Sequence, residues 1–355
     1  MFYIRADANE VIGTGHIMRC LAVAVEMRKN YEEVVFIVAD KYGQEIVESY
    51  GFKTLCLDSH WDNLEYELGI VLPLVKEKHV RGILADSYYV TENYLSSLNQ
   101  CTRLAYIDDV DAFIYPVDLL VNYNIYAEKI DYCRRYMDAG LDTEFLLGCG
   151  YVPLREEFNS IQVKEKFSYS TAMPEDNKQR KILITSGGSG LCNVTGILLD
   201  KLKEKYWFSN TIFHVILGRF NQYRQELQEK WAGYTNVFLY ENVTCISKYM
   251  SMCDIAVTAG GSTVYELCAC GLPSVMYTVA DNQLGIASAF DSLGIVPWCG
   301  DARKNKDTCI EKIIYYIERL LWDDKLLKKK SMKLQKLIDG CGATRIAREL
   351  LQRFL

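Results

Sequence analysis

Residues 254–283, DIAVTAGGSTVYELCACGLPSVMYTVADNQ, decide the fold. A short apolar run leads into Gly260 and Gly261, and Ser262 and Thr263 then open a segment with helical spacing. A second apolar run follows and ends in Asp-Asn-Gln. Glycines allow a close backbone approach, and the amides and dipole of a helix start favour an anion. The stretch therefore predicts a strand, a helix and a further strand, with a diphosphate seat at the glycine pair.

The same alternation extends along the whole chain. Helical spacing separates the apolar runs, as in residues 17–29, and this order predicts repeated strand–helix units in mostly parallel sheets. In the first half the predicted strands are residues 1–6, 33–38, 54–57, 82–85, 103–107 and 118–121. In the second half they are residues 181–185, 213–217, 236–239, 254–257 and 274–277.

The length of 355 residues exceeds what a single hydrophobic core usually supports, so two domains are expected. The periodic pattern dissolves between residues 158 and 180, where polar and charged residues predominate. We therefore predict an α/β protein of two Rossmann-like domains, residues 1–165 and 178–355, whose parallel sheets face a cleft.

Each predicted strand of the first half ends in a polar residue. Ligands of doubly wound sheets bind beyond the carboxyl ends of the strands, so chemistry is expected at these positions. The polar strand ends are Asp7, Asp40, Asp86, Asp108, Asp109 and Asn122.

Composition excludes several classes of protein. The formal net charge of −6 disfavours nucleic-acid binding, which depends mainly on Lys and Arg. No window approaches the roughly 20 apolar residues of a membrane-spanning helix, and residues 1–6 lack the features of a signal peptide. A cytoplasmic, monomeric protein without stable membrane insertion is expected. The basic run 325–336, KLLKKKSMKLQK, suits either an anionic membrane surface or a solvated helix face.

The 13 cysteines follow no repeating spacing, and many lie in apolar segments, so buried reduced thiols are expected. A metal site would need Cys or His partners at ligand spacing, and the sequence offers none. We expect neither a metal nor a cofactor.

Two further features of the second half suit a nucleotide. Glu266 lies one turn into the predicted helix, where its carboxylate could accept hydrogen bonds from ribose hydroxyls, or could simply charge the helix start. Gly187 and Gly188, in SGGSGLCNVT (residues 186–195), again separate a strand from a helix. That segment could bind a ligand or form a tight turn with Asn193 and Thr195 near the helix start.

Residues 254–283 as a whole resemble the UDP-binding half of nucleotide-sugar enzymes with the GT-B fold, MurG among them. In those enzymes the glycine pair and the following hydroxyl residue hold the diphosphate. The resemblance therefore assigns the diphosphate to Gly260, Gly261, Ser262 and Thr263, the ribose to Glu266, and the neighbourhood of the sugar to Gln283.

The first half resembles the PseG family of UDP-sugar hydrolases, which act in pseudaminic acid biosynthesis and share the GT-B architecture. The motifs are IRADANEVIGTGHIMRCLAVA (residues 4–24), DSYY (86–89), YIDD (106–109) and LLGCGYVPLREEF (146–158). They occur in the family's order, and the similarity extends from residue 4 to about residue 295. The family removes UDP from UDP-2,4-diacetamido-2,4,6-trideoxy-β-L-altropyranose by water attack at the anomeric carbon, with inversion.

The resemblance implies that His16 is the general base and that Tyr88 and Asn282 lie near the sugar and the water. Histidine suits this task near neutral pH. Gly13 and Gly15 would make room for the sugar. Further residues carried over from the family bind substrate or organise the sheet end through ion pairs: Arg5, Asp7, Arg19 and Arg155.

The chain departs from the family at Gly190-Leu191, where members often carry Asp-Pro. This difference leaves room for a related UDP-sugar with other acyl groups. Two alternatives to the hydrolase are a MurG-like glycosyltransferase, which hands the sugar to an acceptor hydroxyl, and a nucleotide-sugar binding protein without catalysis.

Overall fold

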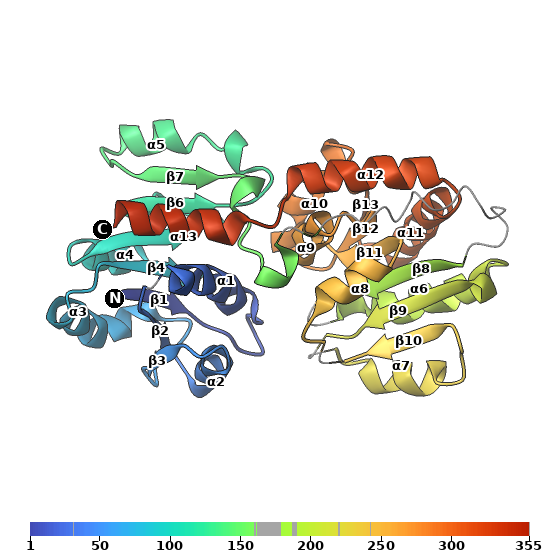
Figure 1. Ribbon diagram of the computed structural model, residues 1–355, viewed down its shortest axis with the longest axis horizontal. Helices are drawn as coiled ribbons and strands as arrows, with labels where there is room; N and C mark the ends of the chain where they lie inside the picture. The colour runs from blue at the N-terminus through green and yellow to red at the C-terminus, as the bar shows by residue number, and fades with distance from the viewer. Residues whose placement is uncertain are drawn as a thin grey trace. The chain divides into compact units, whose positions relative to one another are not determined.

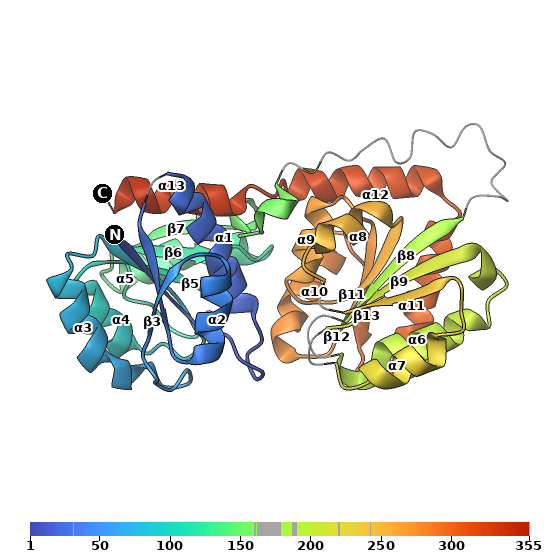
Figure 2. The ribbon, with the colours of Figure 1, turned by 60° about the horizontal axis from the view of Figure 1, so that its bottom comes forward.

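The computed structural model describes residues 1–30, 32–159, 161, 179–186, 190–218, 221–241 and 243–354 (Figures 1 and 2). Contacts divide the chain into two compact units. Unit 1 comprises Met1–Glu156 and Gly340–Leu355, and unit 2 comprises Glu157–Asp339. The last helix thus belongs to unit 1, whereas the predicted second domain, residues 178–355, includes it.

Unit 1 contains a parallel sheet of seven strands in the order β3-β2-β1-β4-β5-β6-β7. The strands are β1 (Phe2–Ala6), β2 (Val34–Val38), β3 (Lys53–Cys56), β4 (Gly82–Asp86), β5 (Arg103–Ile107), β6 (Leu119–Asn122) and β7 (Glu144–Leu147). The α-helices are α1 (Gly15–Lys29), α2 (Lys41–Ser49), α3 (Leu68–Glu77), α4 (Glu92–Asn99), α5 (Tyr132–Asp138) and α13 (Gly342–Arg353). Short 3₁₀ turns are η1 (Leu64–Glu67), η2 (Ala127–Lys129), η3 (Cys149–Tyr151) and η4 (Glu156–Phe158), the last at the unit boundary.

Helix α13 joins unit 1 through an apolar face, one close backbone approach and, at its C-terminal end, a stacked pair of aromatic rings. Its buried residues include Ile346 and Leu350, and it packs beside α1 in both ribbon views (Figures 1 and 2). Phe354 stacks on Phe2 of β1 with ring centroids 6.0 Å apart. A Cβ at Gly342 would overlap the backbone of Val152, so only glycine permits this approach. Because these contacts are made across the sequence, the linear order of the chain does not reveal them.

Unit 2 contains a parallel sheet of six strands in the order β10-β9-β8-β11-β12-β13. The strands are β8 (Arg180–Thr185), β9 (Thr211–Ile216), β10 (Val237–Tyr240), β11 (Ile255–Ala259), β12 (Ser274–Thr278) and β13 (Trp298–Asp301). The α-helices are α6 (Val194–Lys203), α7 (Arg224–Trp231), α8 (Ile246–Met252), α9 (Thr263–Ala269), α10 (Leu284–Ser292), α11 (Lys306–Leu321) and α12 (Asp324–Leu337). Its 3₁₀ turns are η6 (Leu191–Asn193), η7 (Phe208–Asn210) and η8 (Asp281–Gln283).

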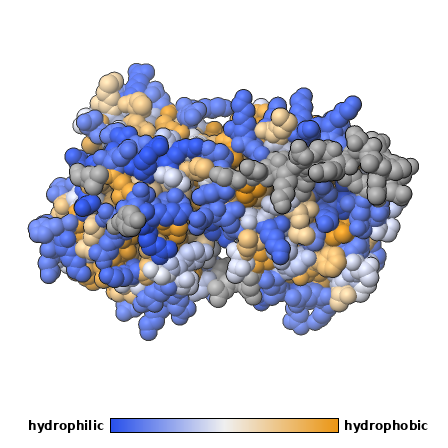
Figure 3. All heavy atoms as spheres, viewed as in Figure 1, coloured by the Kyte–Doolittle hydropathy of each residue, from blue (hydrophilic) through white to orange (hydrophobic). Residues whose placement is uncertain are grey.

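Each sheet is the centre of an apolar core. In unit 1 a cluster that includes Tyr3, Ile83 and Leu104 packs under α3, α4 and α5. In unit 2 a cluster that includes Ile184 and Val257 packs against α6 and α11. On the face seen in Figure 3, hydrophilic side chains cover much of the described surface. Among the described residues, no helix is both long enough and apolar enough to span a bilayer.

The predicted fold class, α/β with two parallel sheets, is confirmed, and the eleven predicted strands lie within two residues of observed strands. The prediction omits β7 and β13, each of which lies at one edge of its sheet. Each has only four residues, and β13 includes Gly300 with φ +117° and a shifted register against β12. The glycine weakens the strand signal of β13. Length and edge position do not explain the omission of β7, because β3 and β10 are equally short edge strands and were predicted.

Candidate active site

The order of strands in unit 1 reverses beside β1, since the chain passes from β1 to β2 and β3 and returns to β4 on the other side of β1. Ligands of open parallel sheets bind beyond the carboxyl ends of the strands at such a switch point. Asp7 follows β1, Asp86 ends β4, and Asp108 and Asp109 follow β5. The carboxyl ends beside the switch point therefore carry several acidic side chains.

The loop between β1 and α1 presents His16. Asn9 and Gly13 form an isolated bridge, with the Gly13 amide 2.9 Å from the Asn9 carbonyl. Gly13 has φ +72°, the left-handed conformation that glycine adopts without steric cost. A Cβ at Gly15 would meet no atom within 4 Å, so protein packing does not require that glycine. The loop closes on itself and places His16 in the first turn of α1.

His16 and Asp86 form a buried pair across the switch point. His16 is 4% exposed, and its Nδ1 lies 2.7 Å from Oδ1 of Asp86. A carboxylate can only accept, so this short contact favours a proton on Nδ1 and, in a neutral imidazole, the lone pair on Nε2. Arg19 Nη2 also lies 3.0 Å from Nδ1, but it donates to Oδ1 of Asp86 at the shorter distance of 2.5 Å. The pair thus has the arrangement in which a histidine accepts a proton through Nε2 while an acidic partner orients its ring.

Arg19, one turn further along α1, joins this pair to the next strands. Its guanidinium donates to both carboxylate oxygens of Asp86 at 2.5 Å, to Asp109 at 2.8 Å and to the Tyr123 hydroxyl at 2.6 Å. Burial raises the pKa of the Asp86 carboxyl, but Arg19 and His16 outweigh this effect and hold the pKa well below its ordinary value. Asp86 therefore stays ionised, with its charge shared between His16 and Arg19.

Tyr88 contacts the imidazole from a more exposed position. Its ring meets the His16 ring edge-on, with centroids 4.4 Å apart, and its hydroxyl donates to Asp109 at 3.2 Å. Burial and the nearby Asp109 carboxylate raise the pKa of the Tyr88 hydroxyl, so it stays protonated near neutral pH. At 40% exposure, Tyr88 combines contact with His16 and access to solvent.

A second buried ion cluster supports the end of β1. Arg5 donates to both carboxylate oxygens of Glu67, at 2.7 and 2.9 Å, and to Asp7 at 2.5 Å. Tyr94 donates its hydroxyl to Glu67 at 2.6 Å. Asp7 also accepts from the Ala39 amide at 2.7 Å. Arg5 and Asp7 thus organise the sheet end through ion pairs, one of the two roles predicted for them.

Three side chains that hold this network together have no predicted role. Asp86 and Asp109 are named above as polar strand ends and lie within the motifs DSYY and YIDD, but without a role, and Tyr123 is not named. Because β1 pairs with β4, Asp86 at the end of β4 lies near His16, which follows β1. A prediction of this strand pairing would therefore have identified Asp86 as a partner of His16. Tyr123 lies 104 residues from Arg19, and no local pattern predicts their contact.

In unit 2 the predicted diphosphate seat lies between β11 and α9. The amides of Gly260 and Gly261 donate to the carbonyls of Tyr277 and Ala259, at 2.7 and 2.9 Å. Among the described residues, the amides of Ser262 and Thr263 have no hydrogen-bond acceptor. The helix start therefore offers the amides of Ser262 and Thr263 to an anion, rather than those of the glycines.

Gln283 lies beside the glycine pair. Its Oε1 accepts from the Val279 amide at 2.8 Å, and its Nε2 lies 4.0 Å from where a Cβ of Gly261 would stand. The Ser262 side chain makes no capping hydrogen bond, so the structure offers no support for a capping role. Glu266 is half-buried on the helix that Thr263 begins. The structure thus brings Gly260, Gly261, Ser262 and Gln283 together.

The remaining predicted site residues are not part of these clusters, or lie outside the residues that the structure describes. Asn282 is exposed on η8, and Arg155 is half-buried after η3 of unit 1. Gly187 and Gly188 lie outside the described residues. Throughout the described ranges, no three His, Cys, Asp or Glu side chains are grouped so as to hold a metal ion.

The local structure at Gly190, where the chain departs from the family, suits glycine. Gly190 has φ +63°, and a Cβ there would overlap the side chain of Asn221. A larger residue at this position would require the Asn221 side chain to move. Two hydroxyls flank the segment, Ser186 Oγ and Thr195 Oγ1, and both are buried without a hydrogen-bond partner among the described residues.

Comparison of the sequence with family models finds no match. Three curated proteins are similar over most of this chain. An uncharacterised protein of Methanocaldococcus jannaschii is 27% identical over 280 residues, which are 77% of this chain and 54% of that protein. The pseudaminic acid cytidylyltransferase and UDP-2,4-diacetamido-2,4,6-trideoxy-β-L-altropyranose hydrolase of Helicobacter pylori is 27% identical over 69% of this chain and 43% of its own.

The UDP-2,4-diacetamido-2,4,6-trideoxy-β-L-altropyranose hydrolase of Campylobacter jejuni is 26% identical over 74% of this chain and 85% of its own. The chain thus spans about half the length of the first two relatives. Among solved structures, MurG of Acinetobacter baumannii has a TM-score of 0.71 at 12% identity, over 99% of both chains. This likeness confirms a fold of the GT-B glycosyltransferase type.

Proposed function

We propose that this chain is a UDP-sugar hydrolase that releases UDP from UDP-2,4-diacetamido-2,4,6-trideoxy-β-L-altropyranose or a close analogue. Water attacks the anomeric carbon and inverts it. The observation that carries the proposal is the buried His16–Asp86 pair, which directs the lone pair of a neutral imidazole to Nε2. The two relatives named as hydrolases of this sugar nucleotide support the choice of substrate.

In the proposed reaction His16 removes a proton from water as the water oxygen bonds to the anomeric carbon. The bond from that carbon to the diphosphate oxygen breaks, and UDP leaves with the electron pair. Asp86 holds the Nδ1 proton and stabilises the imidazolium that forms, while Arg19 fixes Asp86 in place. Tyr88, in contact with the imidazole, is assigned to the sugar and the water.

Unit 2 is proposed to bind the UDP group. The amides of Ser262 and Thr263 would bind the diphosphate, and the absence of side chains at Gly260 and Gly261 would let it approach the backbone. Glu266 would accept from the ribose hydroxyls, and Gln283 together with Asn282 would contact the sugar. Gly13, Gly15 and Arg155 are proposed to contact substrate, and so are Gly187 and Gly188.

A glycosyltransferase is the second candidate, favoured by the fold likeness to MurG. The two functions differ in what attacks the anomeric carbon, since a transferase needs an acceptor hydroxyl in place of water. Incubation of the purified protein with the UDP-sugar in the absence of any acceptor separates them. Release of UDP together with a free sugar, whose first anomer is read from its proton spectrum, supports the hydrolase. Release that requires an acceptor supports the transferase.

The variant His16→Asn tests the base assignment. It should lower turnover by about 10³-fold, because a positioned general base contributes roughly 10²–10⁴-fold, and should leave UDP affinity unchanged. His60→Asn is the matched control, since His60 is an exposed histidine outside the His16–Asp86 network. Near-normal turnover of His16→Asn would refute the assignment. Binding of UDP without turnover in the unmodified protein would instead support a binding protein without catalysis.

A further inference from the structure

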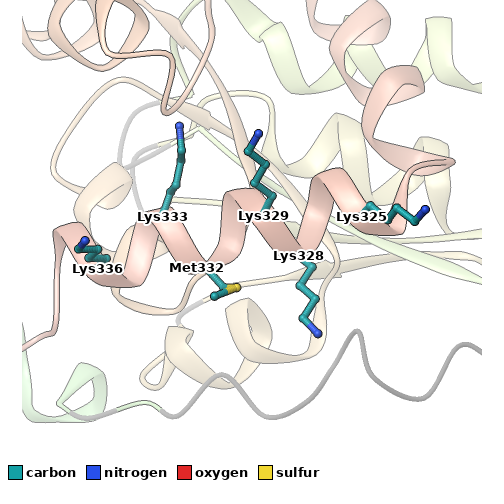
Figure 4. A pocket seen from close by; sticks show the side chains of 6 residues that line it. All are labelled: Lys325, Lys328, Lys329, Met332, Lys333 and Lys336. Carbon is teal, nitrogen blue, oxygen red and sulfur yellow. The ribbon is translucent and has the colours of Figure 1, made fainter.

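Helix α12 (Asp324–Leu337) carries an exposed row of lysines that the proposed reaction does not use. Figure 4 shows Lys329 and Lys333 projecting from one side of the helix and Lys328 and Met332 from the other. We call the exposed side of α12 the lysine face. It is a shallow groove lined by Lys325, Lys328, Lys329, Met332, Lys333 and Lys336.

The charges of the lysine face are unpaired. Among the described residues, none of its five lysines forms an ion pair or a side-chain hydrogen bond, whereas Lys29, Lys53 and Lys230 elsewhere on the surface each contact a carboxylate. An exposed helix usually alternates acids and bases at i, i+4 spacing, which relieves repulsion between like charges. Helix α12 has six lysines and one aspartate, so the repulsion between its lysines is not relieved, although the chain as a whole has a net charge of −6.

The lysine face is also held rigidly. On the opposite side of α12, Leu327 and Leu334 are buried in unit 2. The Asp323 carboxylate caps the helix by accepting from the Leu326 amide at 2.8 Å. Gln335 donates to the carbonyl of Ala269, the last residue of α9, at 3.3 Å. The ammonium groups therefore lie along a fixed rod about 21 Å long, at about 1.5 Å per residue.

The chemistry of this face fits a bilayer of anionic lipids. Lysine is a flexible point charge that suits a diffuse layer of phosphates, whereas specific phosphate recognition favours the planar fork of arginine, which the face lacks. Met332 lies among the ammonium groups and is 64% exposed. Trp322, at the N-terminal end of α12, is 45% exposed. Clustered lysines with a few exposed apolar side chains are typical of a helix that lies on an anionic membrane surface.

We propose that the lysine face of α12 docks this protein reversibly on membranes that contain anionic phospholipid. The charges of the face complement the lipid phosphates, while the rest of this acidic chain is repelled and so orients the contact. The helix lies on the headgroups without crossing them. This proposal does not depend on the reaction proposed for His16.

The test is sedimentation of the full chain with vesicles of phosphatidylcholine, with and without roughly a third of phosphatidylglycerol. At about 0.1 M salt, where the Debye length is about 10 Å, the protein should pellet only with the anionic vesicles. The triple variant Lys328→Glu, Lys329→Glu, Lys333→Glu should bind them about 100-fold more weakly. Circular dichroism and release of UDP should remain unchanged, because all three side chains are exposed.

A charge-matched control reverses three exposed lysines of unit 1, with the changes Lys41→Glu, Lys76→Glu and Lys129→Glu. This control has the same net charge and should retain binding. Equal loss in both variants would overturn the proposal, since net charge alone would then explain binding. Two further results would overturn it: no binding of the unmodified protein to anionic vesicles, or equally tight binding to polyglutamate or to single-stranded DNA, which would identify a general polyanion site.

Discussion

The carboxyl ends of the two sheets are built from different groups. In unit 1 they carry ionisable side chains that bind one another, with Arg19 joined to Asp86 and Asp109 and with His16 joined to Asp86. In unit 2 the end of β11 carries Gly260 and Gly261, and charged contacts appear at the edge strand, where Arg303 pairs with Asp301 and Asp281.

This difference separates two kinds of chemistry. Proton transfer needs ionisable groups whose protonation states are held by their neighbours, and buried charges are costly unless they are paired. Binding of a diphosphate needs amides and room for the ligand, and a nearby carboxylate would repel it. The contrast supports the division in which unit 1 supplies the base and unit 2 holds UDP.

The largest effect should come from Asp86→Asn, which breaks the unit 1 network. An amide can donate as well as accept, so it no longer fixes the proton of His16 on Nδ1, and Arg19 keeps only Asp109 as an ion partner. Turnover measured as UDP release should fall by about 10³-fold. The free energy of unfolding, from urea titration, should fall by about 3 kcal/mol.

The control for this change is Asp40→Asn, at another strand end of unit 1. Asp40 caps α2 by accepting from the Gly43 amide and does not contact His16. Asparagine caps helices about as well as aspartate, so activity should persist. If Asp86→Asn were as active as this control, the orienting role of Asp86 would be wrong.

Glu266→Ala tests the unit 2 side of the comparison. Loss of a carboxylate that accepts from ribose hydroxyls should weaken UDP binding roughly 10- to 100-fold, since hydrogen bonds to charged groups contribute about 1.5–3 kcal/mol. Turnover at saturating substrate should change far less. Calorimetric titration with UDP measures the affinity, and Glu311→Ala, an exposed glutamate of α11, is the control. Unchanged affinity would remove the ribose role.

Gly261→Ala tests whether the glycine pair is needed to bind a ligand or to maintain the fold. The nearest atom to a Cβ at Gly261 is the Gln283 amide nitrogen at 4.0 Å, so the protein itself can accommodate a methyl group. We expect unchanged thermal stability and about tenfold weaker UDP binding, because the methyl group would occupy space proposed for the diphosphate. Gly233→Ala, also in open space, is the control. A variant that binds UDP normally would contradict the proposed seat.

The smallest effect concerns alkaline stability in unit 1. Burial, opposed by Arg19 and reinforced by Asp109, raises the pKa of the Tyr123 hydroxyl to about 12. Since the unfolded chain loses this proton near pH 10, stability falls as the pH rises from about 10 through about 12, by about 1 kcal/mol at pH 11. Tyr123→Phe should reduce this pH dependence in urea titrations. An identical dependence in both proteins would show that Tyr123 does not titrate as described.

Sequence patterns predict those parts of the candidate site that depend on residues close together in the sequence. His16 follows a glycine loop at a strand end, and the glycine pair at 260–261 separates a strand from a helix, so both could be picked out from neighbouring residues. The side chains that bind His16 and Arg19 could not be identified in this way. Asp86 contacts His16, and Tyr123 contacts Arg19, from parts of the chain that are distant in sequence. The sequence also did not predict that the Gly260 and Gly261 amides donate to backbone carbonyls, since the identity of these acceptors depends on backbone geometry.

What the sequence by itself determined is the alternation of strands and helices, the two parallel sheets and the strand ends at which polar residues gather. These features follow from periodicity and from turn residues, which act over a few neighbouring positions. Only the tertiary structure decided that Asp86 pairs with His16, that α13 returns to unit 1 and that Gly190 lies against the side chain of Asn221. Each of these depends on which strands and loops become neighbours in space, and chain order alone does not specify that.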